Sequence, residues 1–167
     1  MPDTAELAVA FFKLIEGNFD HWALWLHGSG YSKVFQVAGD YAEMIAQTLD
    51  EDPRVDSRMY QVIAVDDIFV NDIPSLEACV KVVPVQNDVA LWDCQDYVLD
   101  VLDALDADGF IEDNERYVCI RRQLKRFRGP ADETRHLVVA YDSDDADDDF
   151  DESAADLENS DDNEQSP

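Results

Sequence analysis

A cysteine stands at the predicted start of a helix, in the stretch Trp92-Asp93-Cys94-Gln95-Asp96-Tyr97-Val98. Asp93 is a good N-cap, because its carboxylate can accept the free backbone N–H groups of the first helical turn. Cys94 is then the first helical residue, where the positive end of the helix dipole favours the nucleophilic thiolate. The apolar residues that follow at helical spacing also allow a second interpretation, in which Cys94 is a small buried residue of the core.

Two residues upstream supply the other groups that a cysteine nucleophile needs. His21 opens a predicted strand, Gln36 lies in the next one, and the turn Gly28-Ser29-Gly30 separates the two strands. If the strands pair through this turn, the two side chains are neighbours on one face of the sheet. The imidazole can take the thiol proton, while the amide oxygen of Gln36 holds the ring in the required tautomer. Cys94, His21 and Gln36 therefore form a candidate catalytic triad.

The order of these motifs, with the histidine before the cysteine, resembles the circularly permuted papain-like (NlpC-type) cysteine hydrolases. The chain is most similar to the lecithin:retinol acyltransferase-like group and the PPPDE-type peptidases. Their motifs stand here as His21-Trp22-Ala23-Leu24 and Asp93-Cys94-Gln95-Asp96-Tyr97-Val98. The chain also looks like small uncharacterised fungal proteins with a Trp-Asn/Asp-Cys-Gln-Asp-Tyr/Trp-Val stretch. The resemblance covers residues 21–106. It departs from the family pattern at Asp93, where asparagine is usual, and at Gln36, where the acyltransferase-like group often has a second histidine.

The resemblance implies a permuted papain-like fold and a cysteine hydrolase or acyl-transfer enzyme acting on an amide, isopeptide or thioester bond. It implies that Cys94 is the nucleophile, His21 the general base and Gln36 the residue that orients the histidine. The Cys94 backbone N–H at the helix start would serve the oxyanion hole. Two alternatives stay open: a catalytically inactive protein-binding module on the same fold, and a general α+β domain in which Cys94 belongs to the core.

Side chains next to the two motifs are candidates for the substrate groove. We expect this groove to be lined by Trp92, Trp22 and Gln95. The competing interpretation for the tryptophans is burial in the core. The other two histidines, His27 after the second predicted strand and His136, are expected at the surface.

The chain begins with strand signals and ends with helix signals. Residues 6–15 fit a strand or a short buried helix, and residues 41–49 fit a helix or a strand. The remaining predicted strands are residues 21–26, 33–38 and 60–65, with one more possible at 136–141, and the predicted helices are residues 76–82, 94–108 and 112–128. Strands first and helices after predict an α+β fold, with an antiparallel meander sheet packed against about three helices.

Acidic residues dominate the chain and concentrate at its end. Of the 167 residues, 39 are Asp or Glu and 12 are Lys or Arg. The segment 142–167 holds 13 of the acids, no Lys or Arg and few apolar residues, so we expect a disordered tail after one domain at residues 1–141. That domain keeps 26 acids against 12 bases, a surplus of 14 negative charges that disfavours binding to nucleic acid or anionic lipid.

The remaining features exclude several other classes of protein. The three cysteines, Cys79, Cys94 and Cys119, form no Cys-x-x-Cys pair, which disfavours a disulfide framework and a zinc site. We expect no metal and no cofactor. The acidic start lacks a signal-peptide pattern and no apolar run reaches membrane length, so we expect a cytoplasmic or nuclear monomer without a membrane partner. The expected partner is a protein or acyl substrate, including a basic protein held by the acidic tail.

Overall fold

A computed structural model of the chain describes residues 3–14, 19–28 and 30–129. These residues lie within one compact unit, Met1–Arg135. The strand predicted at residues 136–141, His136, the predicted domain boundary at residue 141 and the acidic tail lie outside the described residues.

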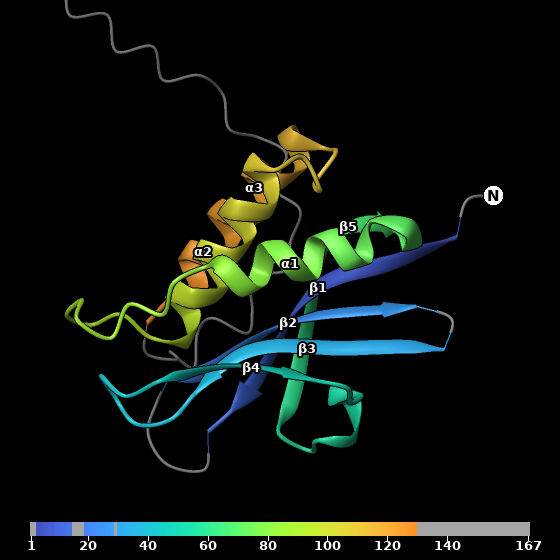
Figure 1. Cartoon of the computed structure of the whole chain (residues 1–167). Helices are drawn as coiled ribbons and strands as arrows, with labels where there is room; N and C mark the ends of the chain where they lie inside the picture. Colours follow the sequence, from blue (N-terminus) through green and yellow to red (C-terminus); the bar gives the residue numbers. More distant parts are fainter. Residues whose placement is uncertain (1–2, 15–18, 29, 130–167) are drawn as a thin grey trace, which may run out of the picture. The chain divides into compact units, whose positions relative to one another are not determined.

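Five antiparallel strands form one sheet in the order β4-β3-β2-β1-β5 (Figure 1). The strands are β1 (Thr4–Lys13), β2 (Asp20–Gly28), β3 (Tyr31–Ala38), β4 (Ile45–Leu49) and β5 (Met59–Phe69). Both ambiguous segments of the sequence therefore hold strands. The strand predicted at residues 60–65 extends beyond its predicted end. In the structure β5 continues to Phe69, because it pairs with β1 as far as Thr4.

In the described part of the chain three helices follow the sheet and lie over one of its faces (Figure 1). They are α1 (Ile73–Val82), α2 (Cys94–Ala107) and α3 (Asn114–Phe127), and two 3₁₀ turns, Pro53–Val55 and Val70–Asp72, precede them. The fold is α+β, as the order of the sequence signals predicted. None of the described helices has the length and apolarity that crossing a bilayer requires.

The alternation of side chains along β2 gives the sheet two different faces. Trp22, Leu24 and Leu26 belong to the main core beneath the helices. Ala23 and Trp25 belong to a second, smaller apolar cluster, completed by Ala10, Phe12 and Val34. Because neighbouring residues of a strand point to opposite faces, His21 shares the face of this second cluster, away from the helices.

The loop between β4 and β5 lies against this second face. The Arg54 guanidinium stands 5.3 Å from the centre of the Trp25 ring, and Pro53 beside it is buried. Ser32 ties the loop to the sheet, since its hydroxyl accepts the Trp25 indole N–H at 2.9 Å and donates to the carbonyl of Glu51 at 2.7 Å. This loop forms one wall of the site described next.

Candidate active site

Helix α2 begins at Cys94 because Asp93 caps it. The Asp93 carboxylate accepts the backbone N–H of Gln95 at 2.8 Å and that of Asp96 at 3.3 Å. Asp96 completes a capping box, since its carboxylate accepts the Asp93 backbone N–H at 3.1 Å. The predicted cap is confirmed, and it fixes the cysteine as the first residue of the helix.

Gln95 anchors this helix start to two distant segments. Its amide donates to the carbonyl of Asp20 at 3.0 Å and accepts the Gly129 backbone N–H at 2.7 Å. The side chain is completely buried. The prediction that Gln95 lines the substrate groove was therefore wrong, because both ends of its amide are engaged in holding α2 to β2 and to the end of α3.

The two tryptophans predicted to line the groove are also core residues. Trp22 is completely buried beneath the helices, where its ring packs edge-on against Phe11 with centroids 5.1 Å apart. Trp92 is buried as well, and its indole N–H donates to the Asp100 carboxylate at 2.9 Å. Neither lines the pocket, because Trp22 points to the opposite face of the sheet from His21 and Trp92 is turned into the core.

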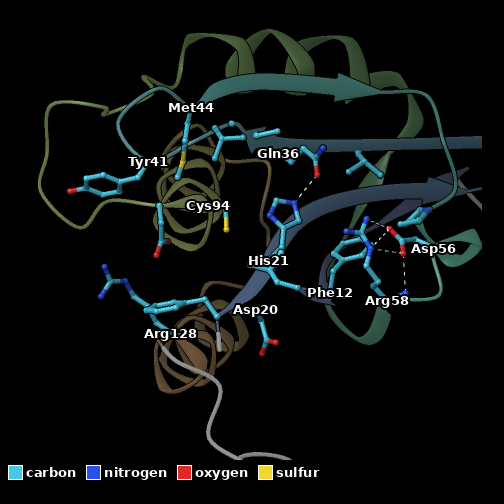
Figure 2. Close-up of a pocket in the computed structure, with 18 of the residues that line it drawn as sticks. Phe12, Asp20, His21, Gln36, Tyr41, Met44, Asp56, Arg58, Cys94 and Arg128 are labelled. Carbon is cyan, nitrogen blue, oxygen red and sulfur yellow. Dashed lines mark hydrogen bonds and ion pairs between the residues drawn. The ribbon is translucent and has the colours of Figure 1, made fainter. Parts of the chain in front are cut away.

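The Cys94 sulfur lies beside the first residues of β2, where this strand pairs with one neighbouring strand instead of two. The pairing of β2 with β3 begins only at Leu24 and Phe35, so the first residues of β2 pair with β1 alone. The backbone N–H of Trp22 lies close enough to the Cys94 sulfur to lower the pKa of the thiol. Since Trp22 directly follows His21, the end of the sheet brings the thiol and the imidazole into one region (Figure 2).

A chain of three side chains orients His21. The His21 Nε2–H donates to the Gln36 amide oxygen at 2.8 Å. The Gln36 amide nitrogen donates in turn to Gln47 Oε1 at 3.2 Å, which turns the oxygen of Gln36 toward the histidine. With Nε2 protonated, the lone pair of the neutral ring lies on Nδ1. The predicted contact of His21 with Gln36 is confirmed, and sequence reasoning missed Gln47.

Cys94, His21 and Gln36 line one pocket of about 1030 Å³ (Figure 2). The second face of the sheet forms its floor, with Phe12 and Val34 among the lining residues. The loop of residues 51–58 forms one wall. The lining also includes Tyr41, Leu91, Arg128 and Gly129. The structure thus joins the three predicted triad members in a cavity large enough for a ligand.

Burial sets the protonation of both reactive groups. It lowers the pKa of His21, and Arg58 also lowers it, while the hydrogen bond to Gln36 and the Asp56 carboxylate raise it. Burial raises the pKa of the Cys94 thiol to about 11, and the Asp93 carboxylate adds to that shift. The expectation that the helix dipole favours the thiolate was therefore wrong in its net result. The first-turn N–H groups do lower the pKa, but desolvation outweighs them.

The resting groups are consequently a neutral thiol and a neutral imidazole. Among the described residues no hydrogen bond joins the Cys94 sulfur to the His21 ring, so a proton transfer requires the two groups to close when a substrate binds. The arrangement can perform base-assisted attack by sulfur on an electrophilic carbon. No cluster of His, Cys, Asp or Glu in the described part of the chain could hold a metal ion.

Several hydrogen bonds that hold pocket-lining residues in place could not be predicted from the sequence. The Tyr41 hydroxyl accepts the Leu91 backbone N–H at 2.8 Å, and the Asn87 amide holds both backbone groups of Met44 at 2.9 and 3.0 Å. These bonds link segments that lie 43 and 50 residues apart along the chain. His27, predicted at the surface after its strand, lies inside β2 and stacks on Trp25 with ring centroids 3.7 Å apart.

Residues 12–112, more than half of the chain, match the model of one protein family, described as "Family of unknown function (DUF6540)". The chain belongs to this family. The matched segment contains His21, Gln36 and Cys94 together with most of the sheet and all of α1 and α2. No curated protein and no solved structure matches the chain.

Proposed function

We propose that this protein is a cysteine hydrolase or acyl-transfer enzyme with a permuted papain-like arrangement of its catalytic groups. The observation that carries the proposal is the 2.8 Å hydrogen bond from His21 to Gln36 beside the capped Cys94, inside one pocket. A thiol, a base and a group that orients the base are the parts that nucleophilic acyl transfer needs. The proposed substrate carries an amide, isopeptide or thioester bond.

The reaction begins with attack of the Cys94 sulfur on the substrate carbonyl carbon. Nδ1 of His21 takes the thiol proton as the carbon–sulfur bond forms, and the amine or thiol leaving group receives that proton when its bond to the carbonyl breaks. A water or acceptor nucleophile then loses a proton to His21 and attacks the acyl-cysteine. The acyl group leaves as an acid or a new ester, amide or thioester, and the sulfur regains its proton.

The start of α2 supplies a donor for the oxyanion that forms in each step. Asp93 occupies the N–H groups of Gln95 and Asp96, so the cap leaves the Cys94 N–H for a substrate oxygen. A fixed N–H at a helix start is well suited to stabilise a developing negative charge. The same dipole that fails to ionise the resting thiol therefore acts on the transition state.

The high pKa of Cys94 assigns a definite role to His21. A thiol with a pKa of about 11 is protonated at neutral pH, so attack depends on a base that removes the proton during the reaction. The lowered pKa of His21 keeps the ring neutral at that pH and ready to accept it. The mechanism resembles that of a serine hydrolase more than that of a preformed thiolate–imidazolium pair.

One observation favours a second candidate function. The same high thiol pKa is expected of a cysteine that performs no chemistry. In that case the pocket would bind a protein segment without cleaving it, on the same fold.

The two candidates are separated by acylation with p-nitrophenyl acetate. We expect release of p-nitrophenol together with an acetyl group on Cys94, located by mass spectrometry of the digested full chain. Cys94→Ala should abolish the release. Cys119→Ala is the matched control, because that thiol is exposed on α3 and does not line the pocket. Equal release by the wild-type chain and Cys94→Ala would leave the binding module as the better account.

A further inference from the structure

Exposed apolar side chains collect around the pocket. Leu91 is 78% exposed and Val55 is 85% exposed, and both line the cavity. Three more exposed apolar side chains line it too: Leu14, Phe19 and Tyr41. Five of the twelve large apolar residues exposed in the described part of the chain are thus gathered at one opening. An apolar rim around a cavity indicates a ligand that covers it.

The backbone beside the thiol is also held in an uncommon conformation. Leu91 has a φ of 65°, in the left-handed region that side chains other than glycine rarely adopt. Tyr41 fixes this conformation by accepting the Leu91 N–H, and both side chains remain exposed at the rim. Strain maintained by a specific contact, at a position that presents an apolar group to solvent, points to a ligand-binding role.

Carboxylates outnumber cations in the same lining. Five acids line the pocket, Asp20, Glu51, Asp52, Asp56 and Asp93, against two guanidiniums, Arg58 and Arg128, an excess of three negative charges. Both guanidiniums already have carboxylate partners, Asp56 at 2.6 Å and Asp96 at 2.7 Å. Among the described residues Asp20, Glu51 and Asp93 form no ion pair. The pocket therefore attracts positive charge, and among the described residues that line it no cation is free to pair with an acidic ligand.

We infer that the ligand of this pocket is a peptide segment that carries an apolar side chain next to lysine or arginine. The apolar group would cover the rim around Leu91 and Val55, and the cationic groups would lie against Glu51 and Asp20. This inference rests on the proposed function for the view that the segment is a substrate. The binding itself depends only on the shape, apolarity and charge of the cavity.

The test measures protection of Cys94 from iodoacetamide in the full chain, because a peptide seated in the pocket covers the thiol. Alkylation of Cys94 is followed by mass spectrometry with three peptides of equal length: a Leu-Leu pair flanked by lysines, the same pair flanked by glutamates, and a Ser-Ser pair flanked by lysines. We expect the Lys-flanked Leu-Leu peptide to protect at a concentration about ten-fold lower than either of the others. The Ser-Ser peptide controls for simple attraction of a basic peptide to the acidic tail.

Variants locate the effect in the pocket. Glu51→Gln should raise the half-protecting concentration about three-fold, whereas Asp67→Asn, an exposed carboxylate outside the pocket lining, should not change it. Leu91→Ser should raise it about five-fold, and Val118→Ser, an exposed apolar residue on α3, should leave it unchanged.

The outcomes distinguish this inference from the proposed chemistry. Equal protection by the Glu-flanked peptide or by the Ser-Ser peptide, or no protection by any of the three, would overturn the inferred ligand class. Protection without Cys94 acylation by p-nitrophenyl acetate would support the ligand class and contradict the hydrolase. Acylation of Cys94 without protection by any peptide would support the hydrolase and contradict the inferred ligand class.

Discussion

Two histidines lie six residues apart on β2 and share the same face of the sheet, yet their surroundings differ in every respect that matters for chemistry. His21 bonds to a neutral amide, Gln36, and lines the pocket with Cys94. His27 is stacked on Trp25, and its Nε2 lies 3.2 Å from the Glu6 carboxylate. His27 does not line the pocket, because it stands at the opposite end of the strand from His21.

The partner of an imidazole decides what chemistry the imidazole can perform. Gln36 fixes the tautomer of His21 without adding negative charge, so burial can keep the ring neutral and Nδ1 available as a base. Nε2 of His27 instead faces the Glu6 carboxylate, and its ring stacks on Trp25. One strand thus carries a candidate catalytic histidine and a structural one.

Alanine substitution of the two histidines should give the largest difference in turnover. His21→Ala should lower turnover of an acyl substrate about 10²- to 10⁴-fold, because the protonated thiol loses its general base. His27→Ala should lower it less than about three-fold, since only packing beneath the loop is changed. Initial rates of p-nitrophenyl acetate hydrolysis for the two variants measure the difference. Similar losses in both would remove the distinction between the two histidines.

Removing the partners of the two rings should give the next largest effect. Gln36→Leu should reduce turnover about 10- to 100-fold, because the ring can then adopt the wrong tautomer. Glu6→Gln, which removes the negative charge beside His27, should have almost no effect. Nitrogen-15 NMR of the imidazoles checks the reason: the wild-type His21 should carry its proton on Nε2, and the Gln36→Leu variant should show a mixture. A single unchanged tautomer in Gln36→Leu would contradict the orienting role.

A substitution at the α2 cap should show how much the charge of Asp93 raises the pKa of Cys94. Asp93→Asn keeps a capping oxygen but removes a negative charge that raises the pKa of Cys94. The pKa of the thiol should fall below about 11, and alkylation by iodoacetamide at mildly alkaline pH should become about two- to five-fold faster. Asp113→Asn at the start of α3 is the matched control, because the Asp113 carboxylate also caps its helix and does not line the pocket. An unchanged or slower rate in Asp93→Asn would assign the raised pKa to burial alone.

The smallest expected effect concerns the outer member of the chain of amides. Gln47→Leu removes the acceptor that turns the Gln36 oxygen toward His21 and should lower turnover about two- to three-fold. Gln47→Glu retains an acceptor at the same place and should restore most of the activity. Equal rates in both variants and in the wild-type chain would show that Gln36 needs no second residue to orient it.

Local patterns were sufficient for most of the fold and for the contact between His21 and Gln36. Apolar runs located β2 and β3, and the turn between them indicated that His21 and Gln36 share a face, as their hydrogen bond confirms. The strand β4 stayed ambiguous because it is an exposed edge strand whose residues show no buried face. The side-chain alternation of β2 could also have excluded Trp22 from the groove, since neighbouring residues of a strand face opposite ways.

What the sequence could not show depends on contacts between distant segments. Gln95 is buried because its partners, the Asp20 carbonyl and the Gly129 N–H, lie 75 and 34 residues away along the chain. The raised pKa of Cys94 has the same origin, because it follows from burial between α2 and β2 that no local pattern reports. The cap at Asp93, by contrast, is a local feature and was predicted correctly.

The pH dependence of Cys94 acylation shows whether His21 acts as the general base. If His21 is the general base, the wild-type rate should rise with the titration of His21, whose pKa is lowered by burial, and then stay level across neutral pH. The His21→Ala rate should instead keep rising toward the thiol pKa of about 11, because only the thiolate then reacts. A wild-type profile that rises in parallel with that of His21→Ala up to the thiol pKa would contradict the account.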